Sequence, residues 1–320
     1  MSSGLFVVVF ALIITTSAWL WHGHGRRLFQ NQAYLDFEVP RNRPFGMVDV
    51  AIMFFTWALV SMAALHIGSA LGWLPAPGTI DELAELTFEE QTSISLAQGL
   101  GVLVGTIISM IIVRLRYRSE SNLFGLGFEG LNRKLLLAFA AFVMVFPFLF
   151  GIQFLCGLIQ EYKHDTLELL KENFSIPTIL ATWFTAVVVA PIAEEVFFRG
   201  LLQAWLQRFL DSPDPGFDVP VMIGGWGVKS SHDLPNSFAL SSKLPPRART
   251  VIFWLPIVIS AFLFGMAHFG QGLAPIPLFV FAIALGYLYR TTGSLIPCIV
   301  VHMLLNGYTM FWLTLQLLEG

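Results

Sequence analysis

The sequence contains little charge and almost no cysteine. Charged residues make up 12% of the 320 residues, whereas a soluble domain usually carries about 25%. The two cysteines, Cys156 and Cys298, lie in apolar stretches, so neither a disulfide framework nor a cysteine-based metal site is supported. The net charge of −3 is small, and we expect no nucleic-acid partner. With 56% hydrophobic residues and a mean hydropathy of +0.71, the chain is predicted to be a protein of the lipid bilayer without a large soluble domain.

Apolar runs long enough to cross a bilayer recur along the whole chain. A membrane helix needs about 20 mainly apolar residues. Eight runs approach or exceed this length, at residues 5–21, 47–69, 94–113, 135–159, 178–206, 251–269, 273–289 and 295–315. The sequence therefore predicts an all-α, polytopic membrane bundle of about eight transmembrane helices. The first run lacks a basic segment before it and a clear cleavage site after it, so we expect a retained span rather than a signal peptide.

The number of lysine and arginine residues alternates between high and low in successive predicted loops. The loops after the first, third and fifth spans contain four, five and five of these residues, and the loops after the second and fourth contain none and two. Basic residues concentrate in cytoplasmic loops. We therefore predict a multi-pass protein of the inner or plasma membrane with both termini outside.

The two halves of the chain differ in their polar content. Residues 1–177 hold four spans with little chemistry, although Gly101 and Gly105 are spaced for close helix packing. Residues 178–320 hold the last four spans and the polar residues considered below. Between the fifth and sixth spans, residues 211–250 are rich in Pro, Gly and Ser, which predicts an irregular cytoplasmic loop.

One apolar run contains three charged residues, Glu194, Glu195 and Arg199. An ionised side chain in the middle of a membrane helix costs about 2.5–3.5 kcal/mol on insertion scales, so these residues need partners, water or a function. Glu195 and Arg199 are four positions apart, share a helix face and can pair. Glu194 points about 100° away and is predicted to be a free carboxylate that could accept a proton. The alternative is a buried structural ion pair that joins two helices.

The later spans supply possible partners for Glu194. His268 lies in the sixth span, and His302 and Asn306 lie on one face of the eighth, four positions apart. A carboxylate, two imidazoles and an amide from three spans can meet only if those spans pack together. Converging polar groups in an apolar bundle are the usual form of a site.

The chemistry of such a site is narrowed by motifs that are missing. The sequence has no H-E-x-x-H metal motif, no serine–histidine dyad of the rhomboid type and no glycine–aspartate pair of the presenilin type. A glutamate that accepts a proton from water, together with donors for an oxyanion, is a hydrolytic arrangement. Alternatively, Glu194, His268 and His302 could hold a metal ion such as zinc that activates the water. The sequence leaves both possibilities open.

The polar motifs resemble those of the CPBP (CAAX protease and bacteriocin-processing, Abi) intramembrane endopeptidases, which include the type II CAAX prenyl endopeptidases. The resemblance covers roughly residues 178–314, and the three motifs occur in order in separate apolar runs. They are Glu194-Glu195-x-x-x-Arg199, Phe264-x-x-x-His268 and His302-x-x-x-Asn306. The resemblance implies an eight-helix α-fold around a conical intramembrane cavity.

The resemblance also implies roles for the polar residues. Glu194 would activate water with help from His268, while His302 and Asn306 hold the oxyanion. Glu195 and Arg199 would support the site. Members of the family have been called both metalloproteases and glutamate proteases, so the implied cofactor is either a divalent metal or none.

The expected function is hydrolysis of a peptide bond in a membrane-associated protein, and a prenylated CAAX protein is one substrate that the resemblance allows. Two other functions remain open. Glu194 and the histidines could form the proton relay of a transporter, although no internal repeat supports this. The chain could also be a scaffold or immunity protein that keeps the motifs without catalysis.

The predicted depth of His268 conflicts with this site, because the residue falls near the outer end of its span. We expect the sixth span to start later than Val251, with Arg247 and Arg249 in a cytoplasmic helical extension. A re-entrant segment around Gly270 is the alternative.

Overall fold

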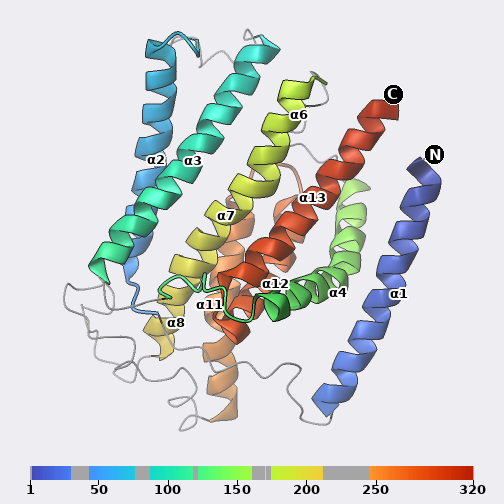
Figure 1. The fold of residues 1–320 in the computed structure, drawn as a ribbon. Helices are drawn as coiled ribbons and strands as arrows, with labels where there is room; N and C mark the ends of the chain where they lie inside the picture. The colour runs from blue at the N-terminus through green and yellow to red at the C-terminus, as the bar shows by residue number, and fades with distance from the viewer. Residues whose placement is uncertain are drawn as a thin grey trace.

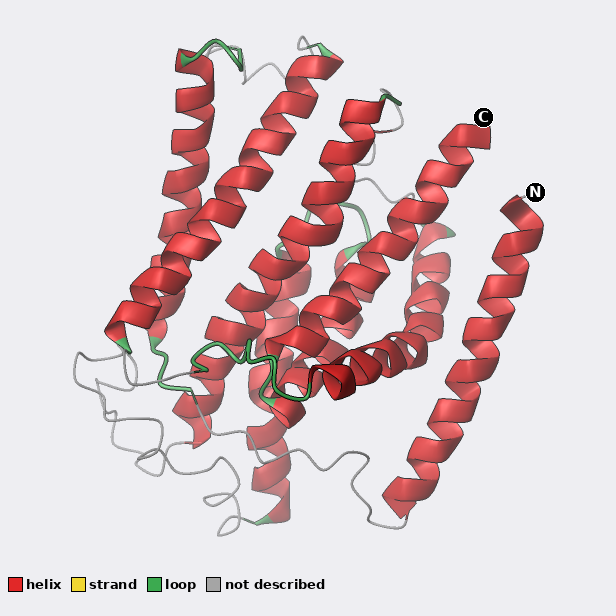
Figure 2. Cartoon of the chain, in the orientation of Figure 1, coloured by secondary structure: helices red, strands yellow, loops and turns green. Residues whose placement is uncertain are grey.

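A computed structural model describes residues 2–29, 43–75, 87–117, 122–160, 170, 174–211 and 245–319, and all regular elements in these ranges are helices (Figures 1 and 2). The first four are α1 (Ser2–Phe29), α2 (Met47–Ala70), α3 (Phe88–Arg116) and α4 (Leu131–Gly157). The fifth is one continuous helix made of the consecutive segments α6 (Ile176–Trp183), η3 (Phe184–Val189), α7 (Ala190–Glu195), η4 (Val196–Gln203) and α8 (Ala204–Asp211). The last three are α11 (Pro246–Met266), α12 (Pro275–Thr292) and α13 (Leu295–Glu319).

These helices confirm the predicted all-α membrane bundle. Six segments in the described ranges are long and apolar enough to cross a membrane, and two shorter apolar helices cover Val7–Gly23 and Thr250–Met266. Each overlaps one of the predicted apolar runs. Both chain ends lie on the same side of the bundle (Figure 1). Which side faces the cytoplasm stays a prediction, and residues 212–244 of the predicted loop lie outside the described residues.

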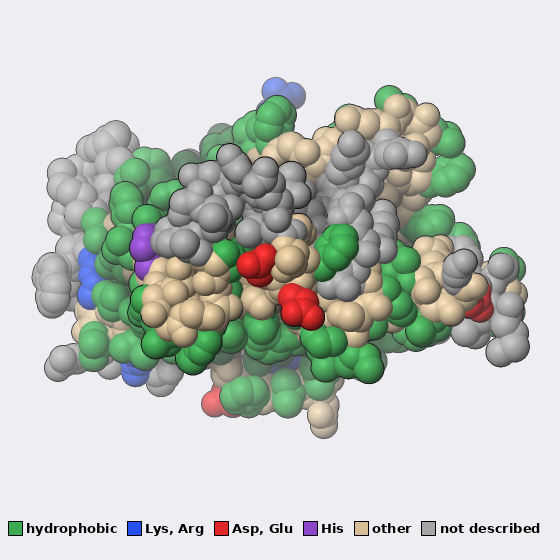
Figure 3. Space-filling model, turned by 90° about the horizontal axis from the view of Figure 1, so that it is seen from above, with side chains coloured by type: hydrophobic (Ala, Val, Ile, Leu, Met, Phe, Trp, Pro, Cys, Tyr) green, Lys and Arg blue, Asp and Glu red, His purple; other side chains and the backbone are tan. Residues whose placement is uncertain are grey.

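The outer surface of the bundle is apolar. Phe55, Leu59 and Leu136 are each more than 60% exposed, as expected for side chains that contact lipid rather than water. Seen from above, the described surface is mostly hydrophobic, with acidic side chains near its middle (Figure 3). The chain is therefore an integral membrane protein whose helices turn their polar groups inward.

The fifth span departs from a regular α-helix around the paired glutamates. It begins at a cap in which Ser175 Oγ accepts a hydrogen bond from the backbone N–H of Thr178. Two π-helical stretches, η3 and η4, flank α7. Wider π-helical turns are rare and frequently occur at functional sites. Glu194 and Glu195 thus lie in one short α-helical segment between two stretches of altered helical pitch.

The α2–α3 hairpin packs through small residues. A Cβ atom added at Gly101 would lie 2.8 Å from Cα of Ser61, and one added at Gly105 would lie 3.2 Å from Cα of Trp57. Both glycines are buried in the α2–α3 contact. This confirms the packing role predicted from their spacing.

Replacing Gly101 with leucine is expected to destabilise the protein, because the new side chain would meet the backbone of α2 rather than a movable side chain. Overpacking of this kind costs roughly 1–3 kcal/mol. Thermal unfolding in detergent measures the change. Gly151→Leu is the matched control, since a Cβ at Gly151 has no neighbouring atom within 4 Å. Equal unfolding temperatures for the two variants would contradict the packing role.

A buried charged cluster, which we did not predict, joins the start of α2 to the end of α3. Asp49 is fully buried, and its carboxylate accepts hydrogen bonds from the Tyr117 hydroxyl at 2.8 Å, from the Gly46 N–H at 2.7 Å and from Arg116. Burial and the neighbouring Asp49 carboxylate raise the pKa of the Tyr117 phenol. Tyr117 therefore remains a hydrogen-bond donor at neutral pH.

The bounds of α11 bear on the predicted position of His268. The helix begins at Pro246, and Arg247 lies in its first turn, which agrees with the expected helical extension. It ends at Met266, and His268 follows in the turn that leads to α12. The upper end of the α11–α12 hairpin lies well below the upper ends of α2 and α3 (Figure 1). His268 thus follows the end of its helix and lies beside Phe264, while its depth in the membrane stays a prediction.

Candidate active site

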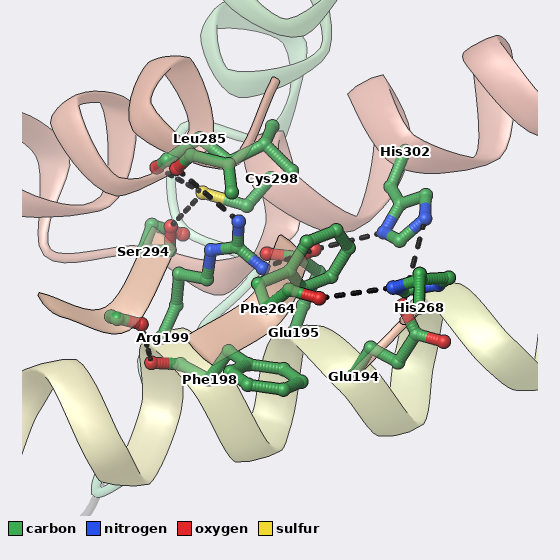
Figure 4. A network of polar contacts seen from close by, with 12 residues as sticks. Glu194, Glu195, Phe198, Arg199, Phe264, His268, Leu285, Ser294, Cys298 and His302 are labelled. Carbon is green, nitrogen blue, oxygen red and sulfur yellow. Dashed lines mark hydrogen bonds and ion pairs between the residues drawn. The ribbon is translucent and has the colours of Figure 1, made fainter. Parts of the chain in front are cut away.

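Glu195 is the centre of a buried polar network (Figure 4). Its Oε1 atom accepts a hydrogen bond from Arg199 Nη1 at 3.0 Å and lies 2.8 Å from Nδ1 of His302. Glu195 is 0% exposed, Arg199 1% and His302 3%. The Glu195–Arg199 pair predicted from helical spacing is confirmed. Glu195 also contacts His302, however, so its role is wider than that of a partner for Arg199.

Arg199 connects this network to the neighbouring helices. Its Nη2 atom donates to the carbonyl oxygen of Ala282 in α12 at 3.3 Å. Its guanidinium lies 4.7 Å from the ring centroid of Phe264 in α11, a distance suited to a cation–π contact. The side chain therefore holds the fifth span against both α11 and α12.

The contact with Glu195 fixes the orientation of His302. An ionised carboxylate only accepts hydrogen bonds, so Nδ1 of His302 carries the proton that is donated to Glu195. The other nitrogen, Nε2, then faces Glu194, whose Oε2 atom lies 3.9 Å away. His302 is thus placed between the two glutamates, with one nitrogen toward each.

The two glutamates differ in exposure as well as in direction. The side chain of Glu194 is 24% exposed, whereas that of Glu195 is 0% exposed. Both residues belong to α7, and successive residues of a helix point about 100° apart. Glu194 is therefore the carboxylate that a water molecule or a substrate can reach.

Phe264 brings His268 to the same region. Its ring centroid lies 5.2 Å from that of His268 and 5.9 Å from that of His302. Nδ1 of His268 lies 2.9 Å from the carbonyl oxygen of Phe264. A carbonyl only accepts, so Nδ1 carries the proton, and Nε2 of a neutral His268 has a free lone pair. In Figure 4 the side chains of Glu194, His268 and His302 converge on one region.

Asn306 is held differently from the other predicted residues. Its Nδ2 atom donates to the carbonyl oxygen of Ala186 in η3 at 2.8 Å. The amide group has a second N–H that this bond does not use. Asn306 lies one helical turn beyond His302 on α13, so the two side chains share a face, but its hydrogen bond to Ala186 places it beside the network rather than within it.

Comparison with known families is consistent with this geometry. Residues 176–229 and 238–308 match the family described as type II CAAX prenyl endopeptidase, Rce1-like. This part of the chain is similar to the Rce1-like family. The match includes all three motifs and extends into α13 as far as Tyr308. Comparisons with curated proteins and with solved structures gave no match.

The similarity to the Rce1-like family supports an intramembrane peptidase of the CAAX type in general terms. The alternative of a metal centre was tested on the donor atoms. In the ranges that the structure describes, no group of three or more His, Cys, Asp and Glu side chains could hold a metal ion. Glu194, His268 and His302 are therefore not arranged as a set of metal ligands.

The Rce1-like domain contains further polar residues that sequence reasoning overlooked. Nε2 of Gln203 donates to the carbonyl oxygen of Gly286 at 2.8 Å, and Ser260 Oγ donates to that of Phe198 at 2.9 Å. The buried Cys298 thiol donates to the Leu285 carbonyl at 3.5 Å. Gln203 lies four positions after Arg199, so the helical spacing used for Glu195 could have identified it.

Proposed function

We propose that this protein is an intramembrane endopeptidase in which Glu194 activates the water molecule that hydrolyses a peptide bond. One observation carries the proposal. A reachable carboxylate lies 3.9 Å from the Nε2 atom of a buried histidine, inside a membrane bundle whose sequence is similar to a peptidase family. General bases must lie within hydrogen-bonding reach of the water they activate, and such contacts are often longer before substrate binds.

Glu194 and His268 are the proposed partners of the attacking water. Glu194 accepts one proton from the water, and Nε2 of His268 accepts a hydrogen bond that fixes the direction of its oxygen. The water oxygen then bonds to the scissile carbonyl carbon. When the carbon–nitrogen bond breaks, the proton held by Glu194 passes to the leaving amine, so that glutamate returns to its starting state.

His302 and Asn306 are the proposed donors to the oxyanion. The second N–H of the Asn306 amide is one donor. Nε2 of His302 can donate only when the ring carries two protons, because Nδ1–H is already directed at Glu195. The Glu195 carboxylate stabilises that doubly protonated ring by direct contact. Fixed donors at a developing oxyanion are among the largest contributions to hydrolytic catalysis.

The proposed substrate is a membrane-associated protein. The family description names CAAX prenyl endopeptidases, so a prenylated CAAX protein is the first substrate class to test. The mechanism proposed here uses no metal ion, in keeping with the donor geometry at Glu194, His268 and His302.

The proposal is tested by comparing peptide termini in membranes that contain wild-type protein or the Glu194→Gln variant at equal abundance. A defined set of new termini is expected with wild type and not with Glu194→Gln. Glu89→Gln is the control, since Glu89 is exposed at the start of α3 and should leave these termini unchanged. Identical termini for Glu194→Gln and wild type would overturn the proposal and favour a scaffold without catalysis.

A further inference from the structure

The fifth span carries polar residues at a regular spacing of four: Glu195, Arg199, Gln203 and Gln207. Residues four apart share a face of a helix, so these side chains form one polar stripe that runs from α7 through η4 into α8. Glu195 and Gln203 are 0% exposed, and Arg199 is 1% exposed. The polar stripe therefore lies inside the bundle and continues past Arg199, the last of its residues that Figure 4 labels.

Each residue of the polar stripe has a buried atom without a hydrogen-bond partner in the part of the chain that the structure describes. Two of these atoms are acceptors, Oε2 of Glu195 and Oε1 of Gln203. The other two are donors, Nε of Arg199 and Nε2 of Gln207. The hydrogen bonds from Arg199 and His302 both go to Oε1 of Glu195. Buried polar atoms rarely stay unpaired, because taking them out of water without a partner is costly.

The order of acceptor and donor atoms selects the molecule that fits. A cation would be repelled by the Arg199 guanidinium and an anion by the Glu195 carboxylate, whereas a neutral molecule that both donates and accepts suits both. The space beside Gln203 is narrow, since a Cβ atom added at Gly286 would lie 2.8 Å from Oε1 of Gln203 and 2.9 Å from Cγ2 of Ile257. Water is neutral and small, and a buried water molecule typically makes about three hydrogen bonds to polar groups that are otherwise unpaired.

We propose that the polar stripe is a binding site for buried water and that Gln203 is a positioning residue, which acts through this water on Glu195. Water that accepts a hydrogen bond from Nε of Arg199 has one hydrogen for Oε2 of Glu195 and one for Oε1 of Gln203. The second oxygen of Glu195 is thereby held, while the first stays directed at Nδ1 of His302. The inference rests on the proposed function, in which His302 donates to the oxyanion.

The water is tested directly in an experimental structure of the full-length protein at a resolution that shows ordered water. A water oxygen is expected about 2.7–3.2 Å from both Oε2 of Glu195 and Nε of Arg199. It should be hydrogen-bonded to Oε1 of Gln203, either itself or through a second water. A direct contact between Gln203 and Nε of Arg199, or no water at these atoms, would overturn the inference. Either result would leave the proposed function intact, because Glu194 and His268 are not part of the polar stripe.

The variant Gln203→Met removes the acceptor and keeps a side chain of similar length. The water is expected to be lost, and kcat on a substrate identified from the termini described above should fall roughly tenfold with KM within about twofold of wild type, as for other residues that orient a catalytic side chain. Ser260→Ala is the matched control. It removes another buried hydrogen bond to the fifth span, from Ser260 Oγ to the carbonyl oxygen of Phe198, and should retain both the water and wild-type kcat.

The two variants separate a positioning role from a loss of packing. Wild-type kcat in Gln203→Met, or water that stays in place in that variant, would overturn the role of Gln203. An equal fall of kcat in Ser260→Ala would overturn it too, because turnover would then follow helix packing rather than the polar stripe. Wild type that holds the water but cleaves no membrane protein would overturn the proposed function, and the positioning role with it, whereas the water site is measured without turnover.

Discussion

Glu194→Gln is expected to reduce turnover by roughly 10²- to 10⁴-fold, the usual contribution of a general base. Glutamine has nearly the same shape but cannot accept the proton from water. Because Glu194 is 24% exposed and its Oε2 atom lies 3.9 Å from Nε2 of His302, its neutralisation should leave folding almost unchanged. The measurement is kcat on an identified substrate, together with thermal unfolding of the same preparation.

His268→Ala should have a similar effect on kcat if the two residues act on one water molecule. The double variant, Glu194→Gln with His268→Ala, should then lose little more than either single variant, since residues that act as a unit are strongly non-additive. Losses that multiply in the double variant would show that the two side chains act separately. Full proteolysis by both single variants would show that the site has been assigned to the wrong residues.

Arg199→Ala should be the most destabilising single change in the network. It removes a guanidinium that is 1% exposed and leaves the Glu195 carboxylate, 0% exposed, without its cationic partner. Removing one partner of a buried ion pair typically costs 3–5 kcal/mol. The contacts with Ala282 and Phe264 are lost as well. The loss of stability is measured by unfolding the protein in a mild detergent with heat or denaturant.

A control and a rescue sharpen this prediction. Arg247→Ala removes an exposed arginine from the first turn of α11 and should change stability by no more than about 0.5 kcal/mol. Replacing both buried partners, Glu195→Gln with Arg199→Met, should recover part of the loss because no uncompensated charge remains. Wild-type stability of Arg199→Ala would contradict the anchoring role given to this residue.

The membrane spans could be predicted from the sequence because the signal is local. A bilayer requires a continuous apolar run in each helix, and each predicted run, such as residues 47–69, overlaps a helix such as α2 (Met47–Ala70). The predicted run at residues 251–269 was displaced from α11 (Pro246–Met266). The arginines at the start of α11 lower the local hydropathy although the chain is already helical there. Hydropathy therefore identified the span better than its ends.

The pairing of Glu195 with Arg199 and the separate direction of Glu194 also followed from the sequence alone, because both depend only on the period of one helix. The contact between Glu195 and His302 joins residues 107 positions apart and exists only because α13 packs against α7. The hydrogen bond from Asn306 to Ala186 and the buried Asp49 cluster depend on helix packing in the same way. The chain's own pattern thus determined which residues are polar within the membrane, whereas the packing of the helices decided which of them meet, since contacts between distant segments have no fixed period along the sequence.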